Sequence, residues 1–384
     1  MLSLSSSKDC GSGCPLIGYL GAKFGIKTVI TCGSFMSSIA VFLCFFAENI
    51  IAITILWGLI FGFCFGLGCV LVPQVMKNHF SNHLDKAIGL TIAGECVIYL
   101  PLTLLTEYSL KTYDYSGTFL MLSGALMHTL PVCLVLSILD QPRSNSLRTV
   151  ESADSLNEHE TKLNQNSFEE HSVPLPSEVP NESVVSAVSG LKLFIDPVFF
   201  VIMLTQSLLL YVNIAILTIF VDISRDHGVL TEDEVYPLIG FAVADAIGRI
   251  FLGLVTDGGY LSKMNFSALC FAAVGFLIIA FVWIKGFAMV MFFSLSCGLF
   301  NGGLFMIGPS MCMHYVENKY YSFAIASRYF LYAPLSFTQA PFIGYFRDTL
   351  QSYDGLLYIL IGVCFLSAIL SLLTPTIIKC RDKR

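Results

Sequence analysis

The chain has 384 residues, of which 55% are hydrophobic and only 12% are charged. A soluble protein of this length carries about 25% charged residues, so this composition excludes an ordinary soluble domain. The net charge of −6 says little about partners, because it comes largely from one polar segment. We expect a lipid bilayer around this chain and no nucleic acid. Most of the 13 cysteines lie inside apolar runs, so we interpret them as small apolar residues and predict no metal or cofactor.

The apolar residues form runs of about twenty residues, which is the length that a helix needs to cross a bilayer. A shorter apolar stretch, Cys14–Gly25, looks like the last part of a further span. The sequence therefore predicts an all-α membrane protein with about ten full transmembrane helices plus an N-terminal fragment of another. The predicted full spans are 28–47, 51–76, 87–108, 117–139, 197–221, 235–256, 264–284, 287–313, 322–346 and 355–378.

A polar stretch, Asp140–Asp196, separates the spans into two groups and is rich in Ser, Glu, Asn and Pro. Such a segment cannot bury enough apolar surface to fold, so we predict a disordered acidic linker at residues 140–196. Residues 1–139 then form an N-terminal transmembrane half, and residues 197–384 form a six-helix C-terminal half with a short basic tail. A symmetric carrier has equal halves, so we expect one whole span and most of a second to be missing from the N-terminus.

The basic residues predict the orientation. Most Lys and Arg residues outside the spans lie in the loops that share one side with the linker and the C-terminal tail. By the positive-inside rule this side is cytoplasmic. The sequons at Asn181 and Asn265 would then stay unmodified, and a glycan on Asn181 would overturn this topology.

Asp245 and Arg249 lie four residues apart in the middle of an apolar segment, Pro237–Asp257. A charge at the centre of a bilayer costs roughly 2.5–3.5 kcal/mol on insertion scales, so it is rarely there without a partner or a function. Spaced by four residues, the two side chains share one helix face. Arg249 is the candidate contact for an anionic substrate, and Asp245 is the candidate proton carrier. Burial favours a protonated carboxyl group, while the neighbouring guanidinium opposes protonation. A purely structural ion pair is the alternative.

Four further polar residues inside the spans are site candidates. Glu95 is a second candidate for proton coupling, or a buried acid paired with Arg328 or with a missing helix. Arg328 is a candidate substrate contact, or a side chain that extends to the nearby membrane surface. Asn213 and Asn301 could line a substrate cavity, or form hydrogen bonds between helices.

The ends of three spans share a pattern, seen in Gly18–Lys27, Gly253–Asp257 and Gly344–Asp348. In Gly-x-x-x-Asp, the glycine permits close packing and the aspartate can cap the N-terminus of a neighbouring helix. The first copy has Ala22 in place of the acid. The pattern resembles the gating loops of the major facilitator superfamily.

The resemblance narrows to the monocarboxylate transporter family. Four passages carry it, namely residues 18–40, 79–97, 240–257 and 320–360. The most specific feature is the motif Asp-x-x-x-Arg at Asp245 and Arg249, which resembles a motif in the eighth span of the family. The resemblance implies a major facilitator helical bundle in the plasma membrane. It also implies alternating-access transport of a small organic anion of the lactate or pyruvate type, with a proton as the candidate coupling ion. A single-span immunoglobulin-type chaperone is an implied partner.

We expect the chain to depart from this family by lacking the first span, which by resemblance carries a functional Lys in proton-coupled members. Two alternatives therefore stay open: a truncated product that does not transport, and a carrier of a neutral or aromatic solute without proton coupling. We predict no enzymatic activity, because the sequence has no Ser–His pairing and no HExxH motif.

Overall fold

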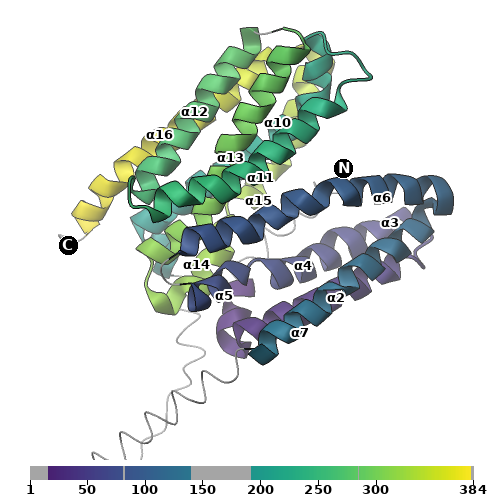
Figure 1. Ribbon diagram of the computed structural model, residues 1–384, viewed down its shortest axis with the longest axis vertical. Helices are drawn as coiled ribbons and strands as arrows, with labels where there is room; N and C mark the ends of the chain where they lie inside the picture. The colour runs from purple at the N-terminus through teal and green to yellow at the C-terminus, as the bar shows by residue number, and fades with distance from the viewer. Residues whose placement is uncertain (1–15, 81–82, 140–191, 284, 382–384) are drawn as a thin grey trace, which may run out of the picture.

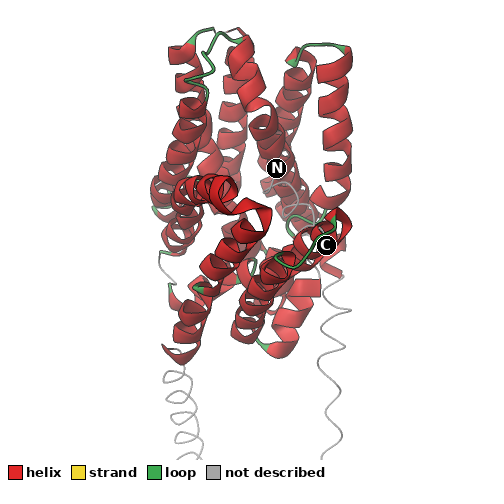
Figure 2. Ribbon diagram, turned by 90° about the vertical axis from the view of Figure 1, so that its right-hand side faces the viewer, coloured by secondary structure: helices red, strands yellow, loops and turns green. Residues whose placement is uncertain are grey.

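The computed structural model describes residues 16–80, 83–139, 192–283 and 285–381. All regular structure within these ranges is helical, as predicted (Figures 1 and 2). Most of the predicted linker and the first two residues of the predicted fragment Cys14–Gly25 lie outside the described residues.

The N-terminal group of helices begins with a short helix over residues 16–24. The elements that follow are α2 (Ile26–Cys44), α3 (Ile50–Ile53), the π-helical segment Thr54–Phe61, α4 (Gly62–Cys69), α5 (Val72–His79), α6 (Leu84–Met127) and α7 (Thr129–Leu139). Helix α6 contains a break at Asp114, which has a φ of 56°. This kink separates two helices that share the label α6, and it falls between the predicted spans 87–108 and 117–139.

The C-terminal group begins at a capped helix end, where the Asp196 side chain accepts a hydrogen bond from the backbone N–H of Val198 and Pro197 takes the first helical position. Its main helices are α10 (Pro197–Asp226), α11 (Val235–Asp257), α12 (Lys263–Trp283), α13 (Phe287–Tyr315), α14 (Tyr321–Ser327), α15 (Tyr332–Gly344) and α16 (Asp354–Arg381). The predicted span 322–346 is divided into α14 and α15 by a turn at residues 328–331.

Within the described residues, eight helical segments are long and apolar enough to cross a membrane. The difference from the ten predicted spans comes from two places. The segment Leu104–Val135 crosses the kink at Asp114 and is therefore counted once, and the turn after Ser327 leaves two pieces that are each too short.

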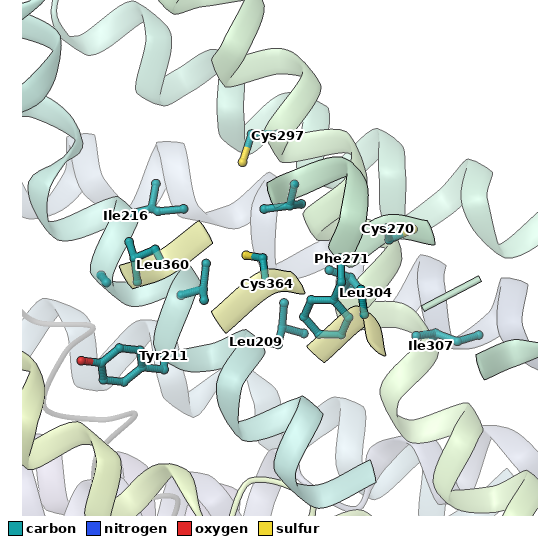
Figure 3. Packing of buried hydrophobic residues seen from close by; sticks show 14 of the residues in the cluster. Leu209, Tyr211, Ile216, Cys270, Phe271, Cys297, Leu304, Ile307, Leu360 and Cys364 are labelled. Atoms are coloured by element: carbon teal, nitrogen blue, oxygen red, sulfur yellow. The ribbon is translucent and has the colours of Figure 1, made fainter. Parts of the chain in front are cut away.

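The core of the C-terminal group lies between α10, α12, α13 and α16. Figure 3 shows Leu209, Phe271, Cys297 and Cys364 packed together there, and all four side chains are buried. The two cysteines therefore act as small apolar core residues, as their place in the sequence predicted.

The two groups of helices meet chiefly along α6 and α11, which lie side by side (Figure 1). Glycine makes this approach possible, because a Cβ atom at Gly89 would clash with the carbonyl oxygen of Arg249. Gly18 packs in the same way against the backbone of Phe323. We call the end where α7 finishes and α10 begins the linker end of the molecule.

Substituting Gly89 tests this close approach. Gly89→Ala should lower the melting temperature of the detergent-purified protein, because overpacking costs about 1–3 kcal/mol. Gly94→Ala on the same helix is the matched control, since a Cβ there meets nothing within 4 Å. Alanine is also the better helix former, so this control should be neutral or slightly stabilising. Equal melting temperatures for the two variants would contradict the packing.

Candidate functional site

The candidate site is centred on the guanidinium of Arg249, which ties the two groups of helices together. Its Nη2 lies 2.7 Å from Oδ2 of Asp245, one turn earlier on α11. Its Nη1 donates to Oε2 of Glu95 at 2.9 Å and to the carbonyl oxygen of Ile92 at 2.9 Å, both on α6. The ring of Phe305 lies 5.1 Å from the guanidinium carbon. Arg249 therefore contacts both halves of the molecule at once.

Asp245 lies at the middle of α11 and is buried. Three donors surround its carboxylate: Arg249 Nη2, Cys96 Sγ at 3.0 Å and Asn301 Nδ2 at 3.1 Å. A buried charge is tolerated when it is paired and its remaining lone pairs are hydrogen-bonded. Asp245 meets this condition.

The side chain of Glu95 is much more exposed than that of its partner Arg249. Its side chain is 75% exposed, whereas that of Arg249 is 7% exposed. The alternative in which Glu95 is a buried acid paired with Arg328 is wrong, because its side chain is exposed and its partner is Arg249. The pair joins residues 154 positions apart in different halves, so no local spacing in the sequence indicated it.

The two asparagines share a small cavity inside the C-terminal group. Its volume is about 10 Å³, close to the lower limit for one water molecule. Asn301 connects the cavity to the site through its hydrogen bond to Asp245, and Oδ1 of Asn213 is buried there without a hydrogen-bond partner. The lining residues are Leu209, Val212, Asn213, Ile216, Phe241, Phe271, Val274, Cys297, Asn301, Leu304 and Cys364.

Arg328 lies apart from this cavity, at the turn between α14 and α15. Its Nη1 donates to the carbonyl oxygen of Ile325 at 3.0 Å, and its guanidinium lies over the ring of Tyr329. The side chain is buried, so the alternative in which it extends to the membrane surface is wrong. These contacts hold Arg328 at the break in the span.

The linker end carries a second set of contacts between the halves. Asp257 accepts hydrogen bonds from the backbone N–H groups of Asp85 at 3.2 Å and Lys86 at 3.0 Å. It thereby caps the N-terminus of α6, which confirms the role predicted for the last residue of Gly253–Asp257. Nearby, Lys263 Nζ lies 2.5 Å from the fully buried carboxylate of Asp85, and Ser310 donates a hydrogen bond to the same carboxylate. Asp85 is not predicted from the sequence, because its only local signal is its position in the first turn of a helix.

The opposite end has a charged cluster that joins segments of the C-terminal group only. Asp222 lies 3.6 Å from Arg347 Nη1 and accepts a hydrogen bond from the Tyr353 hydroxyl at 3.1 Å. Burial and this hydrogen bond to a carboxylate raise the pKa of Tyr353 to about 12. Among the contacts of the described residues, the ionic ones that join the two halves lie at Arg249 and at the linker end.

The fold and the site define a multi-pass membrane carrier built from two helical halves. Residues 11–332 match the family described as the Major Facilitator Superfamily, and the chain belongs to this family. Its members are transporters, and the relatives found are transporters rather than enzymes.

Similar proteins indicate which transporters within this superfamily the chain resembles. The chain is 23% identical over 373 residues to monocarboxylate transporter 12-B of Danio rerio, covering 95% of this chain and 76% of that protein. It is 24% identical over 304 residues to monocarboxylate transporter 2 of Mus musculus, covering 77% and 59%. The crystal structure of the E. coli fucose:proton symporter FucP has a TM-score of 0.64 at 14% identity, covering 96% of this chain and 90% of that one. The chain thus resembles the monocarboxylate transporters and shares the fold of FucP.

The pairing of Arg249 with Asp245 generates a stability prediction. Arg249→Gln should lower the melting temperature strongly, because removing one partner of a buried ion pair costs about 3–5 kcal/mol. Adding Asp245→Asn should restore part of the loss, since no uncompensated buried charge then remains. The measurement is thermal unfolding of the three proteins in one detergent. A double variant less stable than Arg249→Gln would contradict this pairing.

Proposed function

We propose that this chain is a secondary carrier that moves a small carboxylate-bearing solute across the plasma membrane by alternating access. The observation that carries the proposal is the position of Arg249, inside the apolar helix α11 and at the junction of the two halves. Substrate sites of such carriers lie near the bilayer midplane where the two halves meet. A guanidinium is also the side chain best suited to bind a carboxylate through two hydrogen bonds.

Binding at Arg249 requires an exchange of partners. The Nη1 of Arg249 is already bonded to Glu95 and to the Ile92 carbonyl. A solute carboxylate that takes this nitrogen displaces the carboxylate of Glu95, which comes from the other half. The displaced charge needs a cation, and for a simple monocarboxylate that cation is a proton on Glu95 or Asp245. This exchange gives a physical basis for symport of an anion with a proton.

Alternating access requires the halves to separate at the linker end. Opening that end breaks the cap of Asp257 on α6 and the contact between Asp85 and Lys263. Both contacts involve the first turn of α6, the helix that also carries Glu95. Movement of this one helix would therefore affect the contacts at the linker end and the solute site together.

The proposals for orientation and partners rest on the sequence. We propose a cytoplasmic linker and C-terminus, in keeping with the basic residues on that side. Asn213 and Asn301 are proposed to line the path of the solute. The roles of Arg328 in substrate binding and of an immunoglobulin-type chaperone in delivery remain proposals that rest on the sequence alone.

Uptake of radiolabelled carboxylates into cells expressing this chain tests the function. Arg249→Gln should reduce the uptake of the radiolabelled carboxylate by about tenfold or more at equal surface expression, because a charge-assisted hydrogen bond contributes about 1.5–3 kcal/mol. Arg225→Gln is the matched control, since Arg225 pairs with Glu234 away from the site. Unchanged uptake by Arg249→Gln would refute the proposed function.

A further inference from the structure

The charges at the Arg249 site do not balance. Among the described residues in contact with this guanidinium, two are carboxylates, Asp245 and Glu95. The other groups in contact are neutral: the Ile92 carbonyl bonds Arg249, while Cys96 and Asn301 donate to Asp245. When both carboxylates are ionised, the site therefore carries one negative charge more than its single guanidinium offsets.

The two carboxylates have different tasks. Asp245 is buried and receives three donors, so its lone pairs are already occupied. Glu95 is mostly exposed, and among the described residues its ion-pair partner is Arg249. A solute that approaches Arg249 therefore meets Glu95, and Glu95 is the carboxylate that is free to change partners.

A simple anion is a poor match for this arrangement. Its carboxylate would displace Glu95 from Arg249 and leave two carboxylates side by side. Like charges at such separation repel, and the displaced Glu95 is left without a cationic partner. A solute that also carries a cationic nitrogen removes the problem, because Glu95 then exchanges the guanidinium for that nitrogen.

We propose that the solute of this site is a small zwitterion, whose carboxylate binds Arg249 and whose cationic nitrogen binds Glu95. This inference rests on the proposed function and names its substrate class. The Nη1 of Arg249 and the Oε2 of Glu95 lie 2.9 Å apart, so neighbouring groups on one small molecule can reach both. Every charge keeps a partner after the exchange, so binding of the zwitterion requires no proton.

L-Alanine and L-lactate are the matched probes, because they differ only in an ammonium group and a hydroxyl group. Binding of each would be measured by calorimetry on the purified chain in lipid nanodiscs, at neutral and mildly acidic pH. We expect L-alanine to bind at least about tenfold more tightly than L-lactate and to show the same affinity at both pH values. L-Lactate should bind more tightly on acidification, because it needs a proton on the displaced carboxylate.

Glu95→Gln should lower the ratio of L-alanine affinity to L-lactate affinity by at least about tenfold, and it should improve the binding of L-lactate. Glu107→Gln is the control, because Glu107 is an exposed residue of the same helix that pairs with Lys111 at 2.7 Å, outside the site. The control should keep the preference of the unmodified chain.

The outcomes separate the two proposals. If binding depends on Arg249 but L-lactate is preferred, or if Glu95→Gln leaves the preference unchanged, the zwitterion is refuted and the carrier function stands. If Arg249→Gln leaves the binding of both probes unchanged, or neither probe binds, both proposals are refuted.

Discussion

A guanidinium buried among apolar helices needs acceptors, and supplying them to the two Nη atoms of Arg249 shapes the centre of the molecule. Asp245 supplies one acceptor from the same helix, but a single carboxylate leaves the rest of Arg249 without partners. The remaining acceptors come from the other half, from Glu95 and the Ile92 carbonyl on α6. The two helices can come close enough only because position 89 is glycine. The burial of one charge thus requires the two halves to dock.

The same helix links this site to the linker end. Asp85 and Glu95 are ten residues apart on α6, which corresponds to about 15 Å along the axis. The first turn is fixed by Asp257, Lys263 and Ser310, and the third turn is fixed by Arg249. A solute that releases Glu95 removes one of these two attachments. Binding would therefore favour separation of α6 from α11, which is the coupling that alternating access needs.

Much of this arrangement could be predicted from the sequence where the signal is local. The spacing of Asp245 and Arg249 predicted an ion pair on one helix face, and Gly253–Asp257 predicted a helix cap. The contacts between halves could not be predicted in this way. Glu95 and Cys96 meet their partners across about 150 residues, and helix periodicity contains no information on such pairs. The span 322–346 was predicted as one helix because its composition is apolar throughout, and hydropathy does not register the turn at Arg328.

The central claim is that the solute competes with Glu95 for Arg249. It is tested most directly by a double-mutant cycle on solute binding, with Glu95→Gln and Arg249→Gln alone and together. If the two residues act on the same solute through one shared contact, their effects on the binding free energy should differ from additivity by about 1 kcal/mol or more. Additive effects within about 0.3–0.5 kcal/mol would show that the two side chains act independently and would contradict the account.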